Sequence, residues 1–147
     1  MFGDFLKRLT APAPAPLTDT DARLALGALL VRVARSDDDY DTTEVAKIDQ
    51  ILANRYDLTP ADADELRQQC EVLETEAPDT VRFTRAIKNA VPFEDRVAVI
   101  ESLWDVVLTD GVRDAGEDSL LRLVSNLLGV NDVQSAKARQ RVGKQQS

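Results

Sequence analysis

The pattern of apolar and polar positions predicts helices along nearly the whole chain from about residue 18. Apolar residues recur at spacings of three and four, as at Leu26, Leu29, Leu30 and Val33, which is the period of an amphipathic helix. No stretch alternates with the two-residue period of a strand. The predicted helices span about residues 18–36, 42–55, 59–75, 79–91, 93–109, 115–128 and 131 into the C-terminal segment. We therefore expect an all-α fold of about seven helices.

Residues that favour helix ends support several of these boundaries. Thr59 and Pro60 form an N-cap followed by proline at the first helical position, where the missing N–H costs nothing. Gly129 suits a left-handed helix stop, and Asn131 suits the N-cap of the last helix.

A short acidic signature occurs twice, and its copies lie 73 residues apart. The copies read Asp37-x-x-x-Asp41-x-x-Glu44 and Asp110-Gly111-x-x-Asp114-x-x-Glu117. Apolar residues flank both copies at the same offsets, which indicates an internal duplication. We expect two three-helix repeats, at about residues 18–75 and 93–142, joined by a connecting helix at 79–91. Packing them about a pseudo-twofold axis would bury both apolar stripes.

Residues 1–17 form a separate segment ahead of the helical domain at 18–147. Phe2, Phe5, Leu6 and Leu9 give a small apolar face on a short helical stub, and alternating alanine and proline at 11–16 predict an extended spacer. The stub is either a loosely docked tether or a small hook for a partner or a membrane surface.

The net charge of −8 is unevenly distributed. The last eleven residues carry four basic residues and no acid, so removing these four charges leaves −12 on residues 1–136. A body this acidic repels nucleic acid and favours cations or basic protein surfaces. No apolar run reaches the roughly 20 residues that span a bilayer, and no secretory signal is evident. We expect a cytoplasmic protein without a membrane span.

The chain has no histidine and a single cysteine. Histidine-based triads and the commonest zinc sites are therefore excluded. Cys70 falls on the apolar stripe of its helix and is expected to be a buried structural residue. Any metal would be bound by oxygen, which points to calcium, magnesium or manganese.

Helix capping accounts for four of the six repeated acids. Asp41 and Asp114 are three residues ahead of Glu44 and Glu117, which is the spacing of a capping box, and the helix dipole favours acids in a first turn.

Capping does not account for Asp37 and Asp110, which end the preceding helices. A negative charge there is disfavoured by about 0.3–1 kcal/mol. The neighbouring basic residues are Arg35 and Lys47 in the first corner, and Arg113 and Arg122 in the second. Two interpretations stay open. In the first, the clustered carboxylates bind a cation, either within one corner or at a site shared between both corners. In the second, they form a solvated surface. An EF-hand is excluded, because Thr42 replaces the glycine of the sixth loop position and Ile48 the glutamate of the twelfth.

The repeated acidic signature, set in a small helical domain, resembles the TerB family associated with tellurite resistance, whose pattern is Ala-x-x-Asp-Gly-x-x-Asp-x-x-Glu. The resemblance covers about residues 18–142, and the relatives of that family include the N-terminal domain of a membrane-anchored DnaJ-like co-chaperone. It implies an all-α fold, a non-catalytic role in stress response, and a divalent cation held by acidic residues. The ligands it implies are Asp37, Asp41, Glu44, Asp110, Asp114 and Glu117. Asp38 departs from the family pattern, which has glycine there.

We expect a cytoplasmic, non-catalytic module that binds a divalent cation and acts as a scaffold for a protein partner, with peripheral association at a membrane. The alternative is an interaction domain without metal, whose acidic face docks a basic partner. A carboxylate-metal hydrolase is the third hypothesis, and it lacks support from any His, Ser or Cys constellation.

Overall fold

The computed structural model describes residues 19–36, 40–76, 80–109 and 115–146, and the regular structure within these ranges is entirely helical. The helices are α2 (Asp19–Arg35), α3 (Thr42–Tyr56), α4 (Pro60–Glu76), α5 (Thr80–Ala90), α6 (Phe93–Leu108), α7 (Ala115–Leu127) and α8 (Asp132–Gln146). The prediction of an all-α fold with about seven helices is confirmed for this part of the chain. The stub and spacer at 1–17 lie outside the described residues.

The predicted helix ends are present as hydrogen-bonded caps. The Thr59 hydroxyl oxygen accepts a 3.1 Å hydrogen bond from the backbone N–H of Asp62. The Asn131 side chain accepts from the N–H of Gln134 at 2.8 Å, and the Gln134 side chain accepts from the N–H of Asn131 at 3.0 Å. Gly129 has a φ of 78°, the left-handed conformation that suits glycine after a helix.

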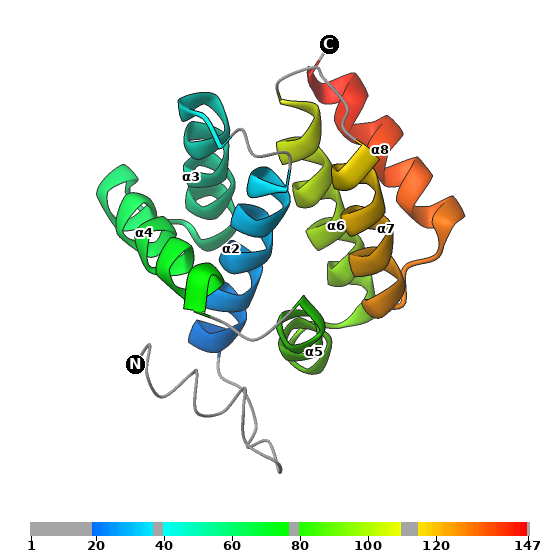
Figure 1. The fold of residues 1–147 in the computed structure, drawn as a ribbon, viewed down its shortest axis with the longest axis horizontal. Coiled ribbons are helices and arrows are strands. Elements are labelled where there is room, and N and C mark those ends of the chain that lie inside the picture. The colour runs from blue at the N-terminus through cyan, green and yellow to red at the C-terminus, as the bar shows by residue number, and fades with distance from the viewer. Residues whose placement is uncertain (1–18, 37–39, 77–79, 110–114, 147) are drawn as a thin grey trace.

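The helices form two groups of three that pack through α2 and α6 (Figure 1). Helices α2–α4 make up one group and α6–α8 the other, while α5 lies across one end between them. In each group the first and third helices share the largest contact, α2 with α4 and α6 with α8. The helices thus form two groups, while the predicted three-helix repeats and their pseudo-twofold relation stay a prediction.

Helix α2 is the centre of the fold and contacts α3, α4, α5, α6 and α7. The sequence predicted one apolar stripe on this helix, but Ala25, Ala28 and Val31 outside that stripe are buried as well. Burial on all sides follows because neighbours from both groups surround the helix.

Trp104 and Cys70 also belong to the core, and the expected burial of Cys70 is confirmed. Trp104 is 8% exposed, and its indole N–H donates to the Ser135 hydroxyl at 3.1 Å. Cys70 is fully buried, and burial raises the pKa of its thiol to about 12. This sulfur is therefore a structural group and not a nucleophile. No helix in the described ranges is both long enough and apolar enough to cross a membrane.

Candidate functional site

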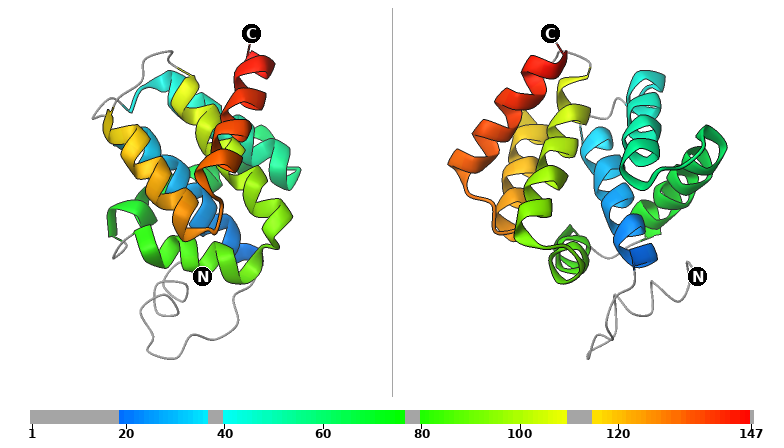
Figure 2. Two further views of the ribbon diagram at one scale, coloured as in Figure 1. Left: turned by 90° about the vertical axis from the view of Figure 1, so that its right-hand side faces the viewer. Right: turned by 180° about the vertical axis from the view of Figure 1, so that it is seen from behind.

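The helix ends that flank the two acidic corners lie at the same end of the molecule. Helices α2 and α6 both finish there, and α3 and α7 both begin there, as the views of Figures 1 and 2 agree. Helix α3 also contacts α6 directly, and the Lys47 ammonium of α3 lies 3.4 Å from the Asp105 carboxylate near the end of α6. The fold therefore brings the borders of the two corners toward one another.

Asp41 has the capping role that its position predicts. It precedes the first residue of α3 with extended backbone angles, and its Oδ1 accepts a 3.0 Å hydrogen bond from the N–H of Glu44. That bond satisfies one of the free N–H groups at the start of the helix.

Glu44 differs from an ordinary first-turn acid because its side chain is only 1% exposed. Acids in first turns are usually solvated, so capping alone does not explain this burial. Removing a carboxylate from water costs free energy unless a positive charge or hydrogen bonds compensate. The burial of Glu44 therefore depends on its contacts with the surrounding fold.

The other four candidate ligands cannot be placed. Asp37, Asp110 and Asp114 lie outside the described residues, and so does the side chain of Glu117, whose backbone belongs to α7. Among the side chains that are described, no group of three or more Asp, Glu, Cys or His could hold a metal ion. The six-residue ligand set therefore stays a prediction.

The described basic residues near the corners all pair with carboxylates outside them. Arg35 Nη1 lies 2.7 Å from Glu74 Oε1 of α4. Lys47 pairs with Asp105, as described above, and in the second group the exposed Arg122 lies 3.1 Å from an Asp132 carboxylate oxygen. Among the described residues, the basic side chains nearest to the corners in sequence thus pair with acids elsewhere in the fold.

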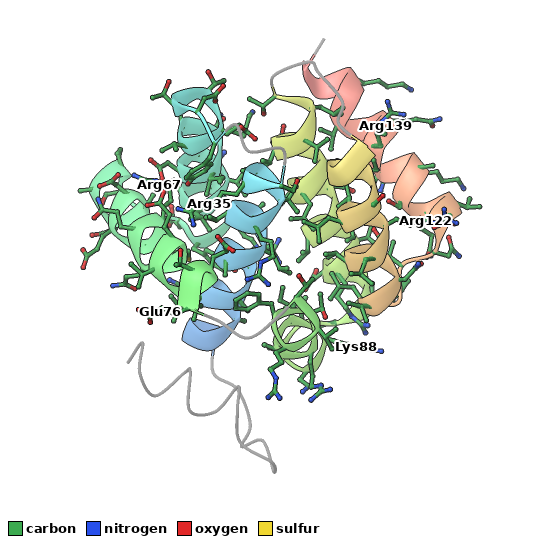
Figure 3. The ribbon with its side chains drawn as sticks, in the orientation of Figure 1. Arg35, Arg67, Glu76, Lys88, Arg122 and Arg139 are labelled. Carbon is green, nitrogen blue, oxygen red and sulfur yellow. The ribbon has the colours of Figure 1, made fainter. Side chains whose placement is uncertain are left out.

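A network around Arg67 was not expected from the sequence (Figure 3). The Arg67 side chain donates to Asp49 at 2.6 Å and to Glu71 at 2.8 Å, and it also pairs with Asp64. Asp64 lies three residues before Arg67, and Glu71 lies four residues after it. Residues at these spacings are neighbours on one helix, so these two contacts could have been predicted from the sequence. The bond to Asp49 crosses from α4 to α3, so only packing of the two helices reveals it.

The same network reaches the first corner through Tyr40. The Tyr40 hydroxyl donates a 2.6 Å hydrogen bond to Glu71 Oε2. Burial and the neighbouring Glu71 carboxylate raise the pKa of Tyr40 above its ordinary value, so this hydroxyl keeps its proton and remains a donor at neutral pH. For Asp49, burial raises the pKa despite the opposing effect of Arg67.

Comparison with known proteins agrees with the resemblance noted from the motif. Neither the curated proteins nor the solved structures contain a match to this chain. A family model described as tellurite resistance protein TerB matches residues 23–140, which is most of the chain and includes both acidic corners. The chain belongs to the TerB family.

Proposed function

We propose that this chain is a non-catalytic module that binds a hard divalent cation, calcium, magnesium or manganese, at its acidic corners. Membership in a tellurite-resistance family supports a role as a scaffold in tellurite or stress response. A cytoplasmic location and a protein partner belong to the same proposal, with peripheral association at a membrane surface.

The match to the TerB family model across both acidic corners carries this proposal. Among the described residues, Arg35 and Lys47 flank the first corner in sequence, and each pairs with an acid on another helix. Carboxylates that are clustered in the sequence repel one another, and a cation from solution relieves this repulsion. Oxygen ligands in a flexible arrangement suit calcium and manganese better than zinc.

Thermal melts with chelator and with added ions test the proposal. A ligand at 100 times its Kd stabilises the folded state by about 2.7 kcal/mol. For a chain of this size that is a rise in melting temperature of roughly 8 °C. The rise should disappear in Asp37→Asn and Asp110→Asn, and it should persist in Asp62→Asn. Asp62 is a matched control, because it is an exposed acid in the first turn of α4. If no hard divalent ion raises the melting temperature, capping alone accounts for the acidic signature.

An interaction domain without metal is the second candidate, and a groove on α4 supports it. The groove has a volume of about 330 Å³ and is lined by Arg35, Glu71, Val72, Thr75 and Glu76. Val72 is 50% exposed there, between two acids of the same helix. A partner that presents an apolar side chain beside a lysine or arginine fits this chemistry. Its binding should weaken with salt and be indifferent to chelator.

A further inference from the structure

Helix α5 carries an exposed strip whose charge is opposite to that of the whole chain. The helix has three basic residues and no acid, whereas the net charge of the chain is −8. Val81, Arg85 and Lys88 are spaced by four and three residues, so they lie on one face of the helix. Val81 is 41% exposed, and the two basic residues beside it are exposed as well. These three residues are called the α5 strip below.

The α5 strip is held on the outside of the fold. Phe83, Ala86 and Ile87 on the other side of α5 are buried, and the helix contacts α2, α6 and α7. In Figure 3 the Lys88 side chain points from α5 away from α2 and α4. Arg85 and Lys88 form no ion pair within the described part of the chain. The strip is therefore available to a partner.

The groove on α4 has the complementary composition, because it combines the exposed Val72 with an uncompensated acid. Glu76 closes α4, and no basic residue lies in the last turn of this helix. The helix dipole disfavours a negative charge at that end. Glu74 of the same turn is compensated by Arg35, whereas the exposed Glu76 has no ion pair among the described residues. A basic group from outside the chain would stabilise Glu76.

Arg32 of α2 links the two helices that carry the groove and the α5 strip. Its guanidinium donates to the carboxylate of Glu74 at 3.2 Å, to the carbonyl of the same residue at 2.9 Å, and to the Thr80 hydroxyl of α5 at 3.2 Å. The end of α4 and the whole of α5 lie at the same end of the molecule (Figure 1). Because α5 is also packed through its buried face, the strip cannot turn into the groove of its own chain. A second copy can bring the two surfaces together.

We propose that the α5 strip of one copy docks in the α4 groove of a second copy of this chain. Val81 then covers Val72, and both side chains leave water. Arg85 and Lys88 lie beside the Glu76 carboxylate, so the charges of the two surfaces are opposite. Each copy carries both surfaces, and two copies that exchange them form a closed, reciprocal dimer. The inference is independent of cation binding, and it names an occupant for the groove of the second candidate function.

Sedimentation velocity of the full chain measures the association. The contact is centred on two valine side chains, so we expect a weak dimer with a Kd of about 10 μM to 1 mM. The charge of −8 on each copy opposes association, and at about 0.15 M salt this repulsion is screened beyond roughly 8 Å. Over that concentration range, the mass should rise from that of one chain toward that of two.

Arg85→Glu tests the charged part of the contact, because it places two acids together and should weaken the dimer about tenfold or more. It also changes the charge of each copy by −2. Lys137→Glu is the matched control, since it makes the same change at an exposed lysine of α8. Dimerisation of this control should equal that of the wild type. Adding Glu76→Lys to Arg85→Glu restores the net charge and reverses the pair, so the dimer should return.

Val72→Asp tests the apolar part of the contact. Val72 is half-exposed, so an acid there is tolerated by the folded chain and should abolish the dimer. Far-ultraviolet circular dichroism of each variant checks that the helices are intact.

Three results would overturn the inference. The first is a wild type that stays monomeric up to about 1 mM, the weak end of the expected range. The second is equal weakening in Arg85→Glu and Lys137→Glu, which is an effect of net charge alone. The third is a charge-reversed double variant that does not recover the dimer. All samples contain chelator, so the absence of cation binding changes none of these expectations and the two proposals fail separately.

Discussion

Helix α2 comes very close to α4 at Gly27, and this contact gives a sharp test of the packing. A Cβ atom placed on Gly27 would lie 2.2 Å from Cys70 Sγ and 3.1 Å from Cys70 Cβ. Nonbonded heavy atoms prefer separations of about 3.5–4.0 Å, so Gly27→Ala has to move the sulfur or the helix by roughly 1.5 Å. Cys70 is fully buried in a packed interior, where such a displacement strains its neighbours.

The free-energy change can be worked out from opposing effects. Overpacking costs about 1–3 kcal/mol. The methyl group added at Gly27 would approach the Cys70 sulfur so closely that the cost should be near the upper value. Alanine gains about 1 kcal/mol over glycine within a helix, which leaves a net destabilisation of about 2 kcal/mol. Cys70→Ala alone should cost about 1 kcal/mol for the lost burial. In the double variant the new methyl group occupies the space that the sulfur leaves, so the clash is largely removed. We expect the double variant to be about 2 kcal/mol more stable than the sum of the single changes.

Urea titration followed by far-ultraviolet circular dichroism, and by the fluorescence of Trp104, measures these differences. Gly143→Ala is a matched control, because the added Cβ meets no atom within 4 Å and the residue lies in α8. This control should be neutral or more stable by up to about 1 kcal/mol. The packing argument is refuted if Gly27→Ala is as stable as the wild type, or if the single changes at Gly27 and Cys70 are additive.

Three further predictions concern individual side chains. Asp41→Ala removes the cap at the start of α3 and should cost about 1 kcal/mol, seen as a lower melting temperature in chelator. Arg67→Ala leaves three carboxylates without their shared partner, and it should lower the free energy of unfolding by about 3–5 kcal/mol in urea titration. Gln68→Ala is the control, because it changes an exposed neighbour on α4, and it should cost less than about 1 kcal/mol. Burial raises the pKa of Cys70 from 9.0 to about 12, so the thiol should not react with Ellman's reagent at pH 8 until the protein is unfolded. The stability that this raised pKa contributes is complete below pH 9 and falls by about 1.4 kcal/mol per pH unit above it, a slope that Cys70→Ala should lack.

Helix ends were predictable from the sequence because they depend on bonds between near neighbours. The caps at Thr59 and Asn131 and the stop at Gly129 each involve residues within a few positions, and all three predictions are confirmed. The burial of α2 on all sides was not predictable in the same way. Ala25 and Ala28 are small enough to stand on a solvated face or a packed one, and the choice depends on helices that are distant in the sequence.

In the candidate site, too, some features follow from spacing in the sequence and others depend on how the helices pack. Asp41 acts as a cap because the hydrogen bond joins residues three apart, which the spacing alone predicts. The burial of Glu44 and the pairing of Lys47 with Asp105 depend on how α3 packs beside α6. The sequence places Arg35 two residues from an acidic cluster, and its neighbours suggested that it would offset those charges. Only the packing of α2 against α4 shows its pairing with Glu74.

The choice between a cation and a basic partner depends on whether the carboxylates converge. A basic protein surface can bind acids that are spread over α4 and the corners, and it tolerates small changes in their separation. A divalent cation needs several oxygens within about 2.3–2.6 Å of one point, so it binds only where the carboxylates converge. Chelator should therefore abolish the binding of a cation and leave the binding of a basic partner unchanged, so it distinguishes the two functions.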